Sequence, residues 1–355
     1  MRSFFINGKF LSQKITGVQR YAIELFRAMD TLLGQDIQAV ILAPKNTIHE
    51  IEFRNIQVRK TGHFRSHLWE HFELPILTGS TFLYSPFTAP PFLNNQVVTL
   101  HDPGALAFPQ YYSTRFRLFY GFVFRRLGKN ARRILTDSEF SKSEFVARCG
   151  IKKEKISVVY PGSEHLMTVK PDHSVFQRIG INPLQPFFLG VSSRSPHKNF
   201  QAIINAMDYL KGRNVPLVIA GGINQGVFSS SEAQAAANTI DAGYVTDGEL
   251  RALYERAYCF IYPSFYEGFG LPPLEAMHSG CPVIVSDRAS LPEVCGEAAL
   301  YCNPERPETI SEAMGRLLDN LALRDELIEK GRQRVKLFTW KECAEKVLSH
   351  ISEFI

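Results

Sequence analysis

Short apolar runs alternate with amphipathic segments along most of the chain, an alternation typical of parallel α/β units. In the N-terminal half, apolar runs that end in polar or turn residues predict strands at RSFFIN, IQAVILAP, TFLYSP, QVVTLHD, RRILTDS and KISVVYPG. After the first of these, GVQRYAIELFRAM places Val18, Tyr21, Ala22, Leu25 and Met29 at helical spacing. These elements predict one doubly wound domain that ends near residue 165.

A second series of the same kind occupies the C-terminal half. Residues 163–186 show no strong period and carry three prolines, which suits a linker or a domain entry. Strands are then predicted at FFLGVSS, VPLVIAGG, YCFIYPS, CPVIVSD and ALYCNP, with helices such as NFQAIINAMDYL and DGELRALYERA between them. We therefore predict Rossmann-like domains at 1–165 and 166–340, and an amphipathic helix at 341–355 that could pack back on the N-terminal domain. Facing sheets would place a ligand cleft at the carboxyl ends of their strands.

Composition fits this picture of two ordinary domains. A chain of 355 residues is long for one core, and 45% hydrophobic with 21% charged residues is usual for a soluble globular protein. The six cysteines stand singly, without zinc or disulfide spacing, and predict buried thiols in a reducing compartment. No apolar run approaches the roughly 18 residues of a membrane span, and the N-terminus lacks a signal-peptide pattern. We expect a cytoplasmic protein.

The net charge of +5 is unevenly distributed. Residues Arg115 to Arg133, RFRLFYGFVFRRLGKNARR, hold seven basic residues and no acid, with Phe and Tyr interleaved. Such a segment suits an interfacial helix at the anionic inner face of a plasma membrane. It equally suits a helix whose aromatic face lies in the core and whose arginines are solvated. Nucleic-acid binding is a third option, but no recognition motif supports it, and no nucleic-acid partner is expected.

The stretch SFYEGFGLPPLEAM, residues 264–277, carries the clearest chemistry. Two glutamates at the spacing of Glu267 and Glu275 occur by chance, but the residues between them are unusual. Gly268 and Gly270 allow close backbone approach to a ligand, and the two following prolines suit the first turn of a helix. The start of that helix would attract phosphate, and Glu275 could accept hydrogen bonds from hydroxyl groups. A nucleotide sugar has both groups; the alternative is a capped core helix with surface glutamates.

The longer segment FYEGFGLPPLEAMHSGCPVIVSDRASLPEV resembles the donor-site signature of retaining glycosyltransferases of family four. The resemblance covers nearly the whole chain, through TGVQRYAIEL, TLHD, TDSEFSK, SPHKN and AGYVTDGELRALYERA in the family's order. It implies the α/β GT-B fold, two Rossmann-like doubly wound domains facing across a cleft. It also implies a nucleotide diphosphate sugar as donor and no cofactor. The chain lacks the Asp-x-Asp of the other main glycosyltransferase fold, so no metal is expected.

The resemblance assigns roles around the donor. Glu275 would bind the ribose hydroxyls, and Glu267 would contact the donor sugar near its anomeric carbon. The backbone of Phe269, Gly270 and Leu271 would hold sugar hydroxyls and phosphate.

The same resemblance assigns a positively charged partner to the diphosphate of the donor. Lys198, in SPHKN, would pair with it and stabilise the charge that grows as the sugar bond breaks, unless it is a surface lysine. The family often has an arginine five or six residues earlier, where this chain has serines; Arg194 could substitute. The backbone of Tyr244 and Val245 would read the base, although core packing suits them nearly as well.

Three residues of the first domain complete the candidates. Gly17 precedes a helix in a loop that could close over phosphate, or it is an ordinary turn glycine. His101 and Asp102 end the strand QVVTL, and we expect them to project into the cleft. The family's matching histidine contacts the transferred sugar or lies beside its reacting centre.

Substrates are suggested only by resemblance. GVQRYAIEL and GFGLPPLEA resemble bacterial polysaccharide mannosyltransferases, which implies GDP-mannose first, with UDP-glucose or dTDP-rhamnose next. The acceptor would be a hydroxyl of a glycan, expected to be lipid-linked, in cell-surface polysaccharide or lipopolysaccharide synthesis. The alternatives are a nucleotide-sugar epimerase or a pyridoxal phosphate-dependent phosphorylase of this fold, or a non-catalytic nucleotide-sugar-binding protein. The sequence identifies neither the glycosidic linkage nor the oligomeric state.

Overall fold

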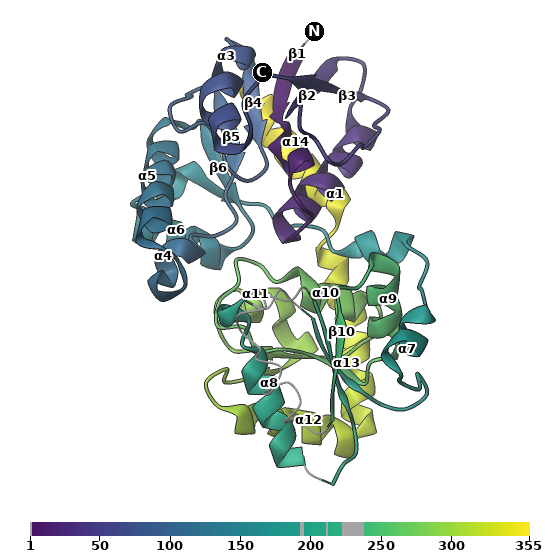
Figure 1. Ribbon diagram of the computed structural model, residues 1–355. Coiled ribbons are helices and arrows are strands. Elements are labelled where there is room, and N and C mark those ends of the chain that lie inside the picture. The colour runs from purple at the N-terminus through teal and green to yellow at the C-terminus, as the bar shows by residue number, and fades with distance from the viewer. Residues whose placement is uncertain (1, 192–194, 211, 222–237) are drawn as a thin grey trace. The chain divides into compact units, whose positions relative to one another are not determined.

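The computed structural model describes residues 2–191, 195–210, 212–221 and 238–355 (Figure 1). The chain divides into two compact units, one made of Met1–Gly162 with Thr339–Ile355 and the other of Ser163–Phe338. Each unit is built around a parallel sheet with helices packed on it. The predicted α/β class with two doubly wound domains is confirmed. The first unit also contains the C-terminal helix, and the chain leaves it after residue 162.

The sheet of the first unit has seven strands in the order β3-β2-β1-β4-β5-β6-β7. All of its strand pairs are parallel. The central strands β4 and β5 are buried along their whole length, as expected for a sheet covered on both faces. The strands are β1 Arg2–Asn7, β2 Ile37–Pro44, β3 Ile56–Thr61, β4 Phe82–Ser85, β5 Gln96–Thr99, β6 Arg133–Thr136 and β7 Ile156–Val158.

Helices cover the sheet of the first unit, and the long helix α1 packs against the C-terminal helix α14. Their shared core contains the large aromatic side chains Phe4, Tyr21, Phe26, Tyr84 and Trp340. The C-terminal helix therefore belongs to the N-terminal unit. The helices are α1 Gly17–Leu32, α2 Ser66–Leu68, α3 Leu74–Thr78, α4 Gly104–Ala107, α5 Thr114–Asn130, α6 Glu139–Cys149 and α14 Trp340–Ser352. Shorter turns are η1 Gly8–Ser12, the π-turn η2 Trp69–Glu73, η3 Pro109–Tyr111 and η4 Lys153–Lys155.

The second unit has a six-stranded sheet in the order β10-β9-β8-β11-β12-β13. Its strands are β8 Phe188–Val191, β9 Leu217–Ala220, β10 Thr239–Gly243, β11 Cys259–Tyr262, β12 Val283–Ser286 and β13 Ala299–Cys302. Its helices are α7 Ser174–Ile179, α8 Phe200–Met207, α9 Asp247–Arg256, α10 Leu271–His278, α11 Leu291–Cys295, α12 Pro307–Asp319 and α13 Leu321–Arg334. Its 3-10 turns are η5 Glu164–Thr168, η6 Pro196–Lys198, η7 Asp208–Leu210, η8 Gly296–Ala298 and η9 Val335–Leu337.

Each apolar run predicted as a strand contains one, but the strands β3 and β10 were not predicted. Both lie at an edge of their sheet, where one side has no neighbouring strand among the described residues and the apolar pattern is weak. Residues 163–186 are not a linker, because they form η5 and α7 and belong to the second unit. The buried side chains of Val175 and Phe176 anchor α7, and Gly180 ends it in the left-handed conformation.

The structure agrees with the expectation for the cysteines. All six are buried and free, with no disulfide among them. Among the described residues, no helix is both long and apolar enough to cross a membrane.

Candidate active site

The loop between β11 and α10 carries the two glutamates of the predicted donor site. Gly270 begins the turn into α10 with a φ of +97°, a conformation that favours glycine. A Cβ atom at this position would lie only 2.7 Å from Cδ2 of Leu291, so the Leu291 side chain would also have to shift. The hydroxyl of Ser290 lies 2.9 Å from the carbonyl oxygens of both Glu267 and Phe269 and donates to them. The protein's own contacts therefore fix this loop.

The structure brings Glu267 and Lys198 together as a buried ion pair. The ammonium of Lys198 lies 2.7 Å from each carboxylate oxygen and donates to the hydroxyl of Tyr262 at 3.1 Å. Only 15% of the Lys198 side chain and 10% of the Glu267 side chain are exposed. The turn η6 is tied to the loop because the amide of Phe265 donates to the carbonyl of His197. Lys198 is therefore not a surface lysine.

The Lys198 side chain of this pair stays positively charged. Burial disfavours the ammonium, but the nearby carboxylate of Glu267 and hydroxyl of Tyr262 together raise the pKa of Lys198 above its ordinary value. Burial, reinforced by Glu267, raises the pKa of Tyr262, so its hydroxyl keeps its proton. The site therefore holds one fixed cation, the Lys198 ammonium. Both carboxylate oxygens of its partner Glu267 already accept hydrogen bonds from it.

Glu275 lies in the second turn of α10 and is also buried. Its Oε1 atom lies 3.2 Å from Nε2 of His165, and the hydroxyl of Tyr254 donates to Oε2 at 3.3 Å. Burial and the Glu275 carboxylate raise the pKa of Tyr254, which keeps this hydroxyl a donor. Each carboxylate oxygen has a second lone pair, so Glu275 can accept further hydrogen bonds from a ligand. It is therefore not a surface glutamate.

Sequence reasoning missed both partners of Glu275. His165 belongs to η5, in the stretch interpreted as a linker or a domain entry, and that stretch has no pattern that could have identified it. Tyr254 belongs to α9, inside a segment that we predicted as a helix and used as a family motif. The spacing of apolar residues predicts which side of α9 is buried, but it does not predict which residue of another segment that side contacts.

The remaining donor-site candidates take different positions. The backbone of Phe269, Gly270 and Leu271 lies in the turn and at the first residue of α10, as the motif predicted. Tyr244 follows the edge strand β10 and is 78% exposed, so its core-packing alternative is wrong. Val245, the next residue, is partly buried. Arg194 lies outside the described residues.

The candidates of the first unit lie at or beside a pocket of about 300 Å³. Its lining residues are Lys9, Gln13, Thr16, Val18, Gln19, His67, Phe87, Thr88, Leu100, His101, Asp102, Tyr120 and Phe124. Gly17 is the first residue of α1, with pocket residues on either side, and not a loop residue as predicted. A Cβ atom on Gly17 would have no protein atom within 4 Å, so the space beside this helix start is open.

His101 is held by two hydrogen-bond acceptors. Its Nδ1 atom lies 2.6 Å from Oδ2 of Asp137, and its Nε2 atom lies 3.1 Å from the carbonyl oxygen of Pro86. A carboxylate and a carbonyl can only accept, so this arrangement fits an imidazolium with both nitrogens protonated. Burial alone would lower the pKa of His101, but Asp137 outweighs burial and raises it. Asp102 accepts the amide of Gly104 at 2.7 Å.

Asp137, which sequence reasoning missed, makes the stability of the protein depend on pH. A pKa raised on folding adds stability that is complete below the unfolded pKa of about 6.5 and is lost as pH rises through the folded pKa. In the Asp137→Asn variant we expect this loss to shrink, because the His101 pKa falls. Urea unfolding between about pH 5 and 9 measures it. Asp36→Asn, on an exposed pair with Arg2, is the control. Equal pH profiles for Asp137→Asn and the wild type would refute the role of Asp137.

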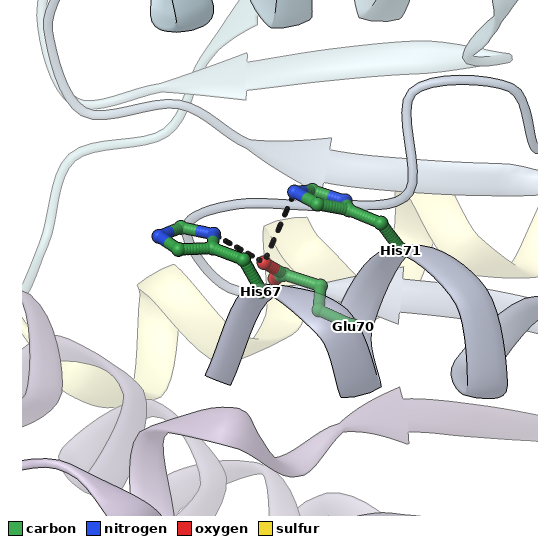
Figure 2. A group of neighbouring side chains, drawn as sticks. All are labelled: His67, Glu70 and His71. Atoms are coloured by element: carbon green, nitrogen blue, oxygen red, sulfur yellow. Dashed lines mark ion pairs between the residues drawn. The ribbon is translucent and has the colours of Figure 1, made fainter. Parts of the chain in front are cut away.

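A histidine–glutamate cluster lies beside the same pocket. Glu70 Oε2 is 3.6 Å from Nδ1 of His67 and 4.0 Å from Nε2 of His71, a spacing that could hold a metal ion (Figure 2). The ammonium of Lys9, however, lies 2.6 Å from the same oxygen and 3.2 Å from Nδ1 of His67. A lysine therefore already supplies the positive charge at this point, and the geometry favours an ion pair over a metal centre.

Hydrogen bonds complete the surroundings of Glu70. Its Oε1 atom accepts from the amide of Asn7 at 2.9 Å and from the hydroxyl of Thr88 at 2.6 Å. Burial opposes ionisation of Glu70, but Lys9, with a hydrogen bond from Thr88, holds its pKa well below the ordinary range. Sequence reasoning did not identify this group, since its members are far apart in the chain.

Comparison with known proteins identifies both units. Residues 15–164 match the model of "Glycosyltransferase Family 4", and residues 173–334 match the model of "Glycosyl transferases group 1". The sequence is 31% identical to O-antigen chain mannosyltransferase B of Escherichia coli, over 74% of this chain and 71% of that protein. It is also 31% identical to O-antigen chain mannosyltransferase RfbU of Salmonella typhimurium, over 63% of this chain and 61% of that protein.

A solved structure shares the whole fold. Sucrose-phosphate synthase from Thermosynechococcus elongatus superposes with a TM-score of 0.77 over 99% of both chains, at 18% identity. An identity this low speaks for the GT-B fold alone. Together with the sequence relatives and the two family models, it shows that the chain belongs to the group 1, family 4 glycosyltransferases of the GT-B fold and is similar to bacterial mannosyltransferases.

Proposed function

We propose that this protein transfers mannose from GDP-mannose to a hydroxyl group of a glycan in bacterial cell-surface polysaccharide synthesis. It retains the anomeric configuration and needs no metal ion. The observation that carries the proposal is the pair of buried glutamates that flank the start of α10, one bound to Lys198 and the other to His165 and Tyr254. The names of the two O-antigen relatives support mannose as the sugar.

Each part of this site suits one part of the donor. Glu275 has free acceptor capacity for the two ribose hydroxyls, and its protein partners hold it in place. The positive end of the α10 dipole and the Lys198 ammonium suit a diphosphate. With Lys198 carrying the charge, the diphosphate has a cation without a metal.

We propose a transfer step that uses these positions. The acceptor oxygen bonds to the anomeric carbon while the bond from that carbon to the β-phosphate oxygen breaks, and GDP leaves with the electron pair. The acceptor's proton passes to an oxygen of the departing phosphate. Lys198 stabilises the charge that develops on this phosphate. Because both oxygens of Glu267 are bonded to Lys198, we favour attack from the side of the leaving group over a covalent intermediate on Glu267.

Thermal unfolding with nucleotide diphosphates and their sugars, in the presence of EDTA, tests the donor site. A ligand at about 100 times its Kd adds about 2.7 kcal/mol to the free energy of unfolding. We expect GDP and GDP-mannose to raise the Tm of the wild type but not of Glu275→Ala, because the ribose loses its acceptor. The control is Glu249→Ala, which removes a buried glutamate paired with Arg178 in the same unit and should keep the ligand-induced shift.

The outcomes separate the parts of the proposal. If only UDP-glucose or dTDP-rhamnose raised the Tm, that nucleotide sugar would be the donor in place of GDP-mannose, and the proposed donor site would stand. If the ligands raised the Tm of Glu275→Ala as much as that of the wild type, the donor site would not lie at α10. A product whose anomeric proton shows the inverted configuration by NMR would refute retention.

A further inference from the structure

The basic helix α5 keeps most of its aromatic side chains out of the core. Its buried positions are Gly121, Val123, Phe124 and Leu127. Four large apolar side chains on its other faces, Phe116, Leu118, Phe119 and Phe122, are between 39% and 70% exposed. The interpretation of this run as a helix with its aromatic face in the core is therefore wrong for these side chains.

A second apolar stripe lies on the segment from α2 to α3. Leu68, Phe72 and Ile76 follow one another at four-residue spacing and are between 56% and 81% exposed. At this spacing, side chains of a helical segment lie on one side. Soluble proteins expose single apolar residues routinely, but two neighbouring stripes of them are unusual.

Ring contacts join the two stripes into one surface. The ring of Phe119 lies 5.4 Å from that of His67 and 5.8 Å from that of His71, on the segment that carries the second stripe. On α5, Phe122 contacts the exposed Phe92 at 6.0 Å, and the guanidinium of Arg126 lies over both rings. We call the exposed side chains of the two stripes, with Phe92 and the basic residues of 115–132, the apolar–basic face.

The charged side chains on the α5 part of this face are all basic. Arg115, Arg125, Arg126, Lys129 and Arg132 are exposed, and residues 103–136 contain no acidic residue. On the second stripe, Glu70 is buried against Lys9. Glu73 accepts the backbone amides of His63 and Phe64. A basic rim around apolar side chains complements a surface that is anionic outside and apolar beneath.

We propose that the apolar–basic face docks the protein on an anionic lipid bilayer. Its aromatic and aliphatic side chains enter the boundary between headgroups and acyl chains, and its arginines pair with lipid phosphates. Aliphatic side chains such as Leu118 and Ile76 favour a bilayer over a nucleic acid, because they cannot stack on bases. His67 and Tyr120 also line the pocket of the first unit, so docking holds that pocket near the bilayer surface. This inference does not depend on the donor or the reaction.

Sedimentation with vesicles tests the proposal. The full chain is mixed with vesicles of phosphatidylcholine alone or with about 30% phosphatidylglycerol, at low and at physiological salt. We expect binding to the anionic vesicles only. The variants Leu118→Ser/Phe122→Ser and Arg125→Gln/Arg126→Gln should each lower the partition coefficient about tenfold or more.

A matched control removes exposed leucines elsewhere. Leu184→Ser/Leu321→Ser changes two side chains of the second unit that are 82% and 66% exposed, and it should bind as the wild type does. Unchanged Tm values show that the face variants are folded. Absence of wild-type binding to anionic vesicles would overturn the proposal, and so would wild-type binding by the Leu118→Ser/Phe122→Ser variant. Binding to a single-stranded oligonucleotide but not to vesicles would overturn it in favour of a nucleic acid.

Discussion

Replacing Lys198 with methionine is expected to lower kcat by about 10²–10³-fold, as the loss of one fixed group that stabilises developing charge commonly does. Methionine keeps much of the length of the side chain but removes the ammonium that lies 2.7 Å from the Glu267 carboxylate. The diphosphate would then leave without its cation. Release of the nucleoside diphosphate, followed at saturating donor and acceptor, measures this loss.

The same substitution also separates catalysis from folding. Glu267 is 10% exposed, and without Lys198 its charge would stay buried without a cation, which costs up to about 3–5 kcal/mol. The double variant Lys198→Met/Glu267→Gln removes both charges and should recover much of this stability, but not the turnover. If Lys198→Met kept the wild-type kcat, Lys198 would have no part in stabilising the leaving group.

The sequence was most informative where burial is continuous. Central strands such as β4, β5 and β12 appear as uninterrupted apolar runs because both of their faces are covered. The edge strand β3 has only one fully buried residue, Ile56, and β10 has only Ala242. An edge strand is fixed by pairing with a neighbour far along the chain, and local patterns do not record that pairing.

The candidate site was predictable to the extent that it lies in one motif. Glu267, Gly270 and Glu275 follow one another within nine positions, and their backbone roles depend on local turn and helix geometry. The partners that hold the charged groups come from distant segments. His165 contacts Glu275 and Asp137 contacts His101 only once the chain has folded, so no residue spacing in the sequence predicts these pairs. The same holds for the pairing of Lys198 with Glu267.

The pair Lys9–Glu70 is the most buried charge pair of the described residues, and removing one partner should have the largest effect on stability. The side chains are 2% and 0% exposed, and the two charged atoms lie 2.6 Å apart. Lys9→Met leaves the Glu70 carboxylate in the interior without its cation, and we expect the free energy of unfolding to fall by about 3–5 kcal/mol. Urea unfolding near pH 7 measures the change.

A double-mutant cycle with Glu70→Gln shows whether the cost comes from an unpaired charge. Glutamine keeps a carbonyl oxygen for the donors Asn7 and Thr88, so Lys9→Met/Glu70→Gln should be more stable than Lys9→Met alone. The depressed Glu70 pKa also means that the pair stabilises the wild type above the unfolded pKa of about 4.3, and that this stability is lost as pH falls. The double variant should lose less stability in acid. Lys60→Met, on an exposed pair with Glu50, should cost under about 1 kcal/mol. If Lys9→Met cost no more than this control, Glu70 would not depend on Lys9, and a water molecule or a bound cation would have to neutralise it.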